Sequence, residues 1–158
     1  GATIEWKGGE ETDMITPILL MAVAAWAAAQ ILKLVIASAY DRKFAWRYLS
    51  TGGGMPSSHS AMVCACATGV GFSEGLDDPL FAIAAVLAFI VMYDACNVRW
   101  ETGKQAKVLN CMMRSWSGEK PELLKKELKE MLGHTPFQVA MGALLGVAVG
   151  VVGSLIAF

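Results

Sequence analysis

Charged side chains are scarce in this sequence. Asp, Glu, Lys and Arg make up 17% of the 158 residues and 55% are hydrophobic, whereas an ordinary soluble domain carries about 25% charged residues. This shortage argues against a soluble domain. The length suits one domain over residues 1–158, with a polar N-terminal tail at 1–15. The formal net charge of −1 implies no bulk nucleic-acid partner.

Residues that ligate metals are also few. The chain has two histidines and four cysteines, and the cysteines show no metal-ligand spacing. Cys64 and Cys66 point to different faces of one predicted helix, so we interpret the cysteines as small buried apolar residues. Repeats and low-complexity linkers are absent. We therefore expect neither a metal site nor a cofactor.

Long apolar runs account for the hydrophobic excess. There are four, and they cover Pro17–Ala39, Pro56–Phe72, Pro79–Ala95 and Pro136–Phe158. Each reaches or approaches the ~20 residues of a membrane-spanning helix. The two middle runs are short, so they must be little tilted or partly covered by protein. The sequence predicts an all-α integral membrane bundle of about four transmembrane helices.

The ends of these runs carry helix signals. Thr16, Asp78 and Thr135 each precede a proline, which predicts a capping side chain followed by proline at the first helical position. Pro56 opens the second run in a similar way. A fifth helix is predicted over Pro121–Leu132, where leucines at helical spacing alternate with Glu and Lys. We expect it to lie on the membrane surface or over the bundle.

The basic residues predict the topology. With four spans, the loops 41–55 and 96–135 share one side of the membrane, and they hold eleven of the 13 Lys and Arg. The other side holds only Lys7, and Lys33 lies inside the first run. This distribution follows the positive-inside rule. We expect the basic side to face cytosol, stroma or matrix.

A glycine-rich loop stands out against the apolar background. The stretch TGGGMPSSHSAMV, residues 51–63, precedes the second run on the basic side. Backbone N–H groups at a helix start favour an anion, Gly54 allows close approach, and Ser57 and Ser58 add hydroxyl donors. His59 could hold or deliver a proton beside a bound phosphate. The alternative is an interfacial loop with a serine cap.

Other polar residues are predicted to converge on the same membrane face. His134 directly precedes the fourth run and Arg99 follows the third. Lys33 lies two-thirds along the first run, from where its side chain could snorkel toward the basic side. Asp94 lies near the end of the third run, where an ionisable residue is costly. It is either catalytic or a structural partner of Lys33 or Arg99.

Four stretches carry a family resemblance. They are GGMPSSHSA (53–61), FAIAAVLAFIVMYDACNVR (81–99), GKQAKVLN (103–110) and LGHTPFQVAMGALLG (132–146). In content and order they resemble the divergent branch of the type 2 phosphatidic acid phosphatases, the PAP2 family, which is related to acid phosphatases and vanadium haloperoxidases. The resemblance implies an α-helical membrane protein with a phosphate pocket that works through a phosphohistidine without a metal.

The resemblance also implies catalytic roles. The segment 56–59 matches the Pro-Ser-Gly-His motif of the family, so His59 would protonate the leaving alkoxide. His134 would match the nucleophilic histidine, and a neutral imidazole is able to attack phosphorus. Parent enzymes carry an acid one helical turn after the nucleophile to orient it. This chain has Gln138 there, which accepts a hydrogen bond but brings no negative charge.

The implied phosphate ligands come from several parts of the chain. Ser57 and the backbone amides around it would bind phosphate, with Lys33 and Arg42 matching the first family motif. Arg99 would replace an arginine that parent enzymes place shortly before the nucleophile. Trp100 stands where a second arginine is expected. Such cations would spread the charge on the phosphate oxygens.

Two functions of different class follow. The first is a metal-independent phosphatase acting on a lipid or isoprenoid phosphate. The second is a catalytically lapsed subunit whose helices bind protein, lipid or pigment within a larger membrane complex. Gln138 and Trp100 favour the subunit, whereas the intact Ser57, His59 and His134 favour the enzyme. A haloperoxidase is least favoured because the chain is short.

The membrane itself is predicted less specifically. The charge rule fits a bacterial inner membrane and an organelle inner or thylakoid membrane alike. The chain begins with Gly rather than Met, from which we expect an imported, processed protein, with the plastid favoured. Membrane lipids are the expected surroundings in either case.

Overall fold

The computed structural model describes residues 10–41, 54–117, 128 and 133–158. Within these ranges every regular element is a helix, which confirms the predicted all-α class. The elements, in chain order, are α1 (Glu10–Asp41), α2 (Ser58–Ser73), α3 (Pro79–Tyr93), the π-helical turn η2 (Asp94–Val98), α4 (Arg99–Arg114) and α5 (Pro136–Ala157).

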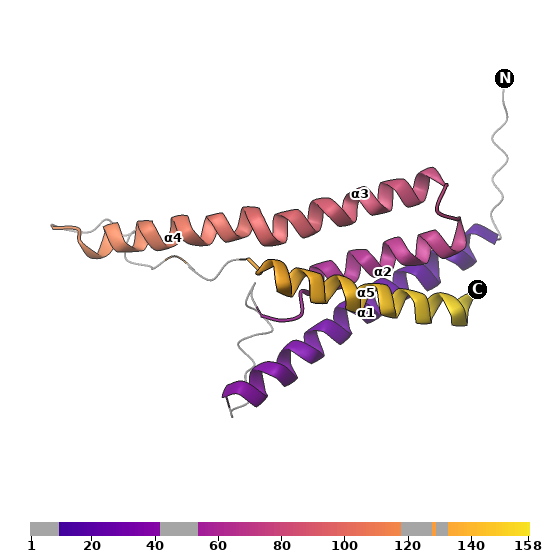
Figure 1. Cartoon of the computed structure of the whole chain (residues 1–158), viewed down its shortest axis with the longest axis horizontal. Coiled ribbons are helices and arrows are strands. Elements are labelled where there is room, and N and C mark those ends of the chain that lie inside the picture. The colour runs from indigo at the N-terminus through magenta and orange to yellow at the C-terminus, as the bar shows by residue number, and fades with distance from the viewer. Residues whose placement is uncertain (1–9, 42–53, 118–127, 129–132) are drawn as a thin grey trace, which may run out of the picture.

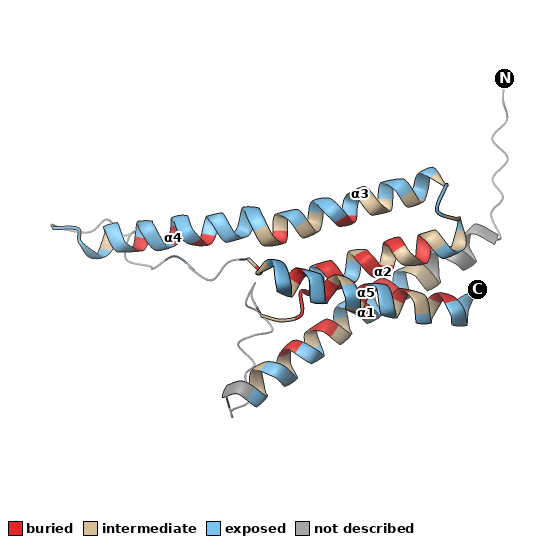
Figure 2. Ribbon diagram, in the orientation of Figure 1, coloured by how far each residue is buried: buried red, intermediate tan, exposed pale blue. Residues whose placement is uncertain are grey.

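The short helix α2 is the centre of the bundle. It packs against α1, α3 and α5, and the buried positions concentrate along these contacts (Figure 2). Ala25 and Ala29 of α1 meet Ala61 and Ala65 of α2 in a fully buried cluster. Small side chains of this kind let membrane helices approach closely.

Glycines of α5 make the closest helix contact. A Cβ at Gly142 would overlap the carbonyl oxygen of Ser57, and a Cβ at Gly146 would overlap that of Ala61. A Cβ at Gly150, one turn further on, would overlap the side chain of Thr68. The glycine stripe therefore packs α5 onto α2, and it brings the N-terminal ends of both helices together.

Within the part of the chain that the structure describes, three helical stretches are long and apolar enough to cross a membrane, namely Pro17–Ala39, Pro79–Arg114 and Pro136–Ala157. The predicted membrane bundle is confirmed in class. The helix α2 has 16 residues, fewer than the ~20 of an independent span, and its neighbours cover it. Of the two alternatives expected for the short middle runs, little tilt or cover by protein, α2 shows the second.

Helix starts follow the predicted caps in two of four cases. Asp78 caps α3 and Thr135 caps α5, each with proline at the start of the helix. The predicted start at Thr16 is wrong, because α1 begins at Glu10 and contains Pro17. In α2 the cap is Ser57, one residue after Pro56.

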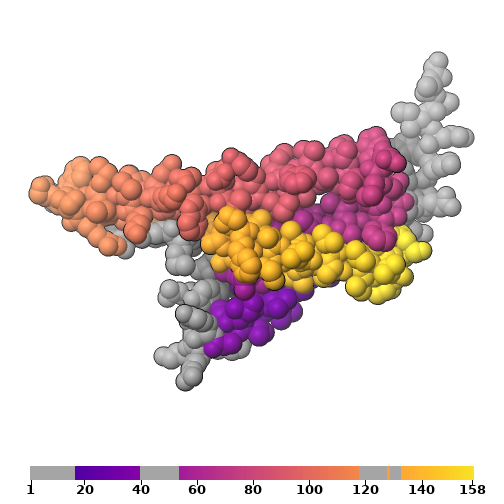
Figure 3. Space-filling view, viewed as in Figure 1, coloured from indigo at the N-terminus to yellow at the C-terminus, as the bar shows by residue number. Residues whose placement is uncertain are grey.

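The predicted loop that begins at Cys96 is also wrong over its first part. Helix α3 continues through η2 into α4, which projects beyond the rest of the bundle (Figures 1 and 3). Gly103, Ala106 and Asn110 form a narrow buried face, which the charged residues between them hide in the sequence. The Asn110 amide exchanges two hydrogen bonds of 2.9 Å with the Leu128 backbone. Apart from Leu128, the predicted helix over 121–132 lies outside the described residues.

Candidate functional site

The backbone at the starts of α2 and α5 and in the π-turn η2 meets where the sequence predicted a polar site. The Ser57 N–H at the start of α2 donates to the Gln138 carbonyl in the first turn of α5 at 3.1 Å. The His134 N–H, just before α5, donates to the Ala95 carbonyl of η2 at 2.9 Å. The starts of α2 and α5 and the π-turn therefore form one connected framework.

This framework brings the two histidines together. The ring centroids of His59 and His134 lie 6.3 Å apart, with the planes at 61°. His134 is 1% exposed, while His59 in the first turn of α2 is exposed. One imidazole is therefore shielded and its neighbour is open to incoming molecules.

The capping box of α5 fixes the tautomer of His134. The Thr135 backbone N–H, which can only donate, lies 3.2 Å from Gln138 Oε1. The same oxygen lies 3.3 Å from His134 Nδ1. Because an amide oxygen only accepts, Nδ1 carries the proton and Nε2 of the neutral ring holds a lone pair. Nε2 is buried and makes no hydrogen bond with any described residue.

The surroundings also favour the neutral ring. Burial lowers the pKa of His134 below its ordinary value, and the charges of Lys33 and His59 add to this. The hydrogen bond to Gln138 and the nearby Gly54 backbone oppose the change. The net direction of the pKa is downward, so His134 is uncharged at neutral pH and its Nε2 keeps an unprotonated lone pair.

Lys33 reaches the site from within the bundle. The residue is 4% exposed, so it is buried in protein rather than snorkelled to the membrane surface. Gly54 has φ +101°, and a Cβ there would lie 3.2 Å from Lys33 Cγ and Cδ. The glycine thus makes room for the lysine stem. The ammonium charge acts on both histidines.

Asp94 and Arg99 form an ion pair beside His59. Arg99 Nε lies 2.7 Å from Asp94 Oδ2, and both side chains are partly exposed. The electrostatic environment of His59 includes Arg99 and Lys33 as positive charges and Asp94 as a negative one. Arg99 therefore contributes positive charge at His59, while Asp94 holds its guanidinium.

The serines serve first as helix starts. Ser57 is fully buried and its Oγ accepts from the Ser60 N–H at 3.4 Å, which leaves the hydroxyl proton free to donate elsewhere. Ser58 is also buried. Arg42 lies outside the described residues.

Sequence reasoning missed three contributors to the site. Thr135 was identified only as a cap, although the Thr-x-x-Gln spacing is the sequence signature of a capping box. Gly133 has φ +98°. A glycine is the residue that adopts positive φ most easily, so its place directly before His134 was a signal for such a turn. The role of Ala95 depends on its carbonyl, for which the sequence carries no signal.

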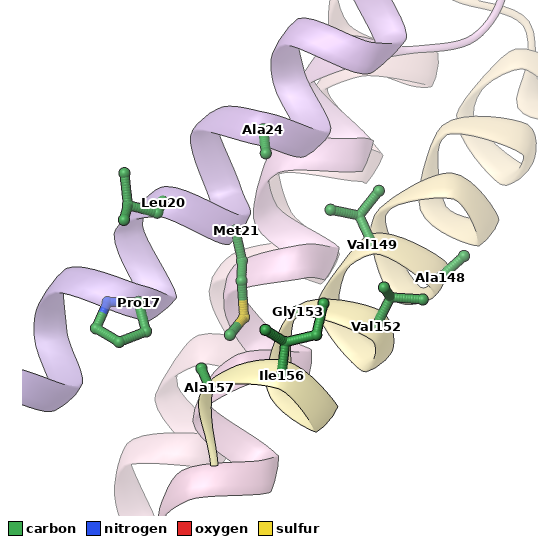
Figure 4. A pocket seen from close by; sticks show the side chains of 10 residues that line it. All are labelled: Pro17, Leu20, Met21, Ala24, Ala148, Val149, Val152, Gly153, Ile156 and Ala157. Carbon is green, nitrogen blue, oxygen red and sulfur yellow. The ribbon is translucent and has the colours of Figure 1, made fainter.

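An apolar groove lies elsewhere in the bundle. A groove of about 820 Å³ runs between α1 and α5 at the end of the bundle away from the histidines (Figure 4). Its lining is apolar and includes Leu20, Met21, Val152 and Ile156. It has no ionisable side chain and is separate from the histidine site.

Comparisons with known proteins agree with the sequence resemblance. The model of a family described as the divergent PAP2 family matches residues 14–149. An uncharacterized membrane protein, YuiD of Bacillus subtilis (strain 168), is 42% identical over 139 residues, which cover 82% of this chain and 88% of that protein. No solved structure matches the chain.

Proposed function

The chain belongs to the divergent PAP2 family, and from this premise we propose that it is a membrane phosphatase. The proposed substrate is a lipid or isoprenoid phosphate, hydrolysed through a phosphohistidine at His134 without a metal, as the family implies. The observation that carries the proposal is the buried, unpartnered Nε2 of His134, 6.3 Å in ring-centroid distance from an exposed histidine.

The chemistry follows from the two imidazoles. The Nε2 lone pair of His134 attacks phosphorus while the bond from phosphorus to the ester oxygen breaks. The departing oxygen takes the bonding electron pair and a proton from His59, and leaves as an alcohol. Water then attacks the phosphorus and gives a proton to His59. The P–N bond breaks toward Nε2, and inorganic phosphate leaves.

Positive charge supports binding of the phosphoryl group. Lys33 and Arg99 are proposed to balance the charge on its equatorial oxygens, and the start of α2 to contribute N–H groups and partial positive charge. Ser57 would donate its hydroxyl proton. Arg42 is proposed as a further ligand from the sequence resemblance alone.

A second candidate rests on Gln138. A neutral amide orients His134 but cannot balance the positive charge that the imidazole gains in the phosphorylated intermediate. A lapsed enzyme that uses its helices to hold lipid, pigment or a protein partner would have this feature. The ion pair of Arg99 also favours a lapsed enzyme, since Asp94 already neutralises part of the arginine charge.

The proposed setting is a membrane whose cytoplasmic side, or stromal or matrix side, faces the basic end of the bundle. The Bacillus subtilis relative is named as a membrane protein, which supports the membrane without specifying the compartment. A plastid location stays a prediction from the sequence. The alcohol part of the substrate would remain in the lipid phase.

Release of inorganic phosphate tests the proposal. Purified protein in detergent, without added metal, is incubated with a panel of lipid and isoprenoid phosphates, beside His134→Ala and Gln138→Glu. We expect turnover in the parent chain, loss of at least ~10³-fold in His134→Ala, and faster turnover in Gln138→Glu.

Two other results would change the conclusion. Turnover in Gln138→Glu alone would identify a lapsed enzyme. Inactivity of every variant on the whole panel, with folding verified by thermal unfolding, would contradict the phosphatase proposal.

A further inference from the structure

The π-turn η2 releases one backbone carbonyl. In an α-helix the Arg99 N–H would donate to the carbonyl of Ala95, four residues earlier. It donates instead to Asp94, five residues earlier, as the wider π-turn requires. The Ala95 carbonyl is thereby left without its helical donor in the middle of a continuous helix.

The released carbonyl accepts a hydrogen bond from the segment just before α5. The His134 N–H donates to Ala95 O at 2.9 Å, and Ala95 is buried. The preceding residue, Gly133, lies against the same stretch of backbone. A Cβ on Gly133 would lie 2.6 Å from Trp100 N and 2.9 Å from Arg99 C. The residue pair 133–134 is therefore docked on the junction of η2 and α4.

The same turn aligns the ion pair beside the other histidine. Residues five apart in an α-helix are separated by about 140° around the axis, given 3.6 residues per turn. A π-turn brings them nearly into line, and Arg99 Nε reaches Asp94 Oδ2 at 2.7 Å. Arg99 held in this way acts on His59. One turn thus determines the surroundings of both imidazoles.

We propose that η2 is a positioning element of the phosphate site. Its Ala95 carbonyl holds the backbone of His134 in place. In that position the capping box of Thr135 and Gln138 can orient the His134 ring. Through Asp94 the π-turn holds Arg99 toward His59. Its role in binding phosphate rests on the proposed function, whereas its effect on the His134 ring is independent of any reaction.

A matched pair of glycine substitutions tests the docking. Gly133→Ala and Gly75→Ala place a side chain at the same φ of +98°, but a Cβ at Gly75 meets nothing within 4 Å. Both variants therefore carry similar backbone strain, and only Gly133→Ala pushes the loop away from η2. A second pair uses deletions: removing Asn97 shortens η2 by the extra residue, and removing exposed Met112 alters only the end of α4.

The first readout is the nitrogen NMR signal of the histidine rings in detergent at pH 7.5, which separates protonated from unprotonated ring nitrogens. The chain has two histidines, so His59→Gln assigns the signal of His134. The second readout is the affinity for inorganic phosphate. We expect the parent chain, Gly75→Ala and the Met112 deletion to show protonated Nδ1 on His134.

In Gly133→Ala and in the Asn97 deletion, we expect the His134 ring to lose this single tautomer and phosphate to bind ~10-fold or more weakly. An unchanged tautomer in both would overturn the proposal. A changed tautomer in a chain whose parent form binds no phosphate would support the positioning role and contradict the phosphatase proposal. The two proposals are thereby tested separately.

Discussion

At the scale of single residues, Gln138 performs two tasks with one oxygen. Its Oε1 accepts from the Thr135 N–H and from His134 Nδ1, so the cap of a helix also fixes the tautomer of the candidate nucleophile. An acid at this position would accept the same bonds and add negative charge. The glutamine keeps the geometry and leaves the pKa of His134 under the control of burial.

That lowered pKa predicts a pH dependence of stability. The unfolded chain binds a proton on His134 at its ordinary pKa near 6.5, and the folded chain only at lower pH. Between these values the unfolded state holds more protons, so the free energy of unfolding falls as the pH is lowered through this window. Each unit of lowering corresponds to about 1.4 kcal/mol lost once the pH is below both values.

Thermal unfolding in detergent between pH 7.5 and 5 measures this effect. Burial and the charges of Arg99 and Lys33 lower the pKa of His59 as well, so the comparison is between the parent chain and His134→Gln. We expect a shallower loss of stability toward acid in the variant. Equal slopes for the two proteins would show that His134 does not contribute.

At the scale of elements, the contact between α5 and α2 depends on the absence of side chains. Gly146→Val would place a branched side chain against the Ala61 carbonyl and separate the two helices. We expect it to destabilise the bundle by about 2–3 kcal/mol or more, as overpacking does. Ala148→Val adds a similar bulk at an exposed position of the same helix and serves as the control.

Unfolding of both variants in detergent checks this expectation, and the histidine site adds a second measurement. Because the same contact brings the starts of α2 and α5 together, Gly146→Val should also separate the two imidazoles and weaken phosphate binding. Equal stability of the two valine variants would mean that the interface adapts.

Local signals explain which elements were predictable. The caps at Asp78 and Thr135 act within one helical turn, and both predictions are confirmed. The continuation into α4 was missed because its buried face consists of small or polar residues among charges, a pattern that suggests a solvated loop. The π-turn could not be foreseen, since the donor for the Ala95 carbonyl comes from residue 134, far along the chain.

Some features of the candidate site were likewise predictable from the sequence and others were not. The predicted topology put His59 and His134 on the same membrane face, and the structure has their rings in edge contact. The burial of Lys33 was not predicted, because the sequence does not reveal that the loop at Gly54 folds over its stem. Apolar length alone predicted the spans, yet the shielding of α2 required knowledge of which helices surround it.

At the scale of the whole molecule, the two ends of the bundle differ in charge. Among the described residues, Arg99, Lys104, Lys107 and Arg114 lie on α4, which extends from the histidine end. The turn between α2 and α3 at the opposite end contains only acidic charges, as the stretch 74–78 shows. The positive-inside rule then predicts that the histidine end faces the cytosol, or the stroma or matrix of an organelle.

Labelling with a membrane-impermeant maleimide tests this orientation. The expectation that the cysteines are buried is wrong for Cys111, which is exposed on α4. It serves as the reporter when the other three cysteines are replaced by alanine. We expect it to react in inside-out vesicles and not in intact cells. A second reporter, Leu76→Cys with Cys111 also replaced, lies in the exposed turn at the other end and should show the reverse. The opposite pattern in both would place the histidine site on the outer face.

The π-turn also bears on how this family diverges. A π-turn holds one residue more than the α-turn it interrupts, so in evolutionary terms η2 amounts to a single-residue insertion inside a helix. Losing that residue would return the Ala95 carbonyl to its helix and leave the loop at Gly133 without its docking surface. Relatives lacking the extra residue should therefore also lack glycine at position 133, so that an insertion and a substitution distant in sequence are inherited together.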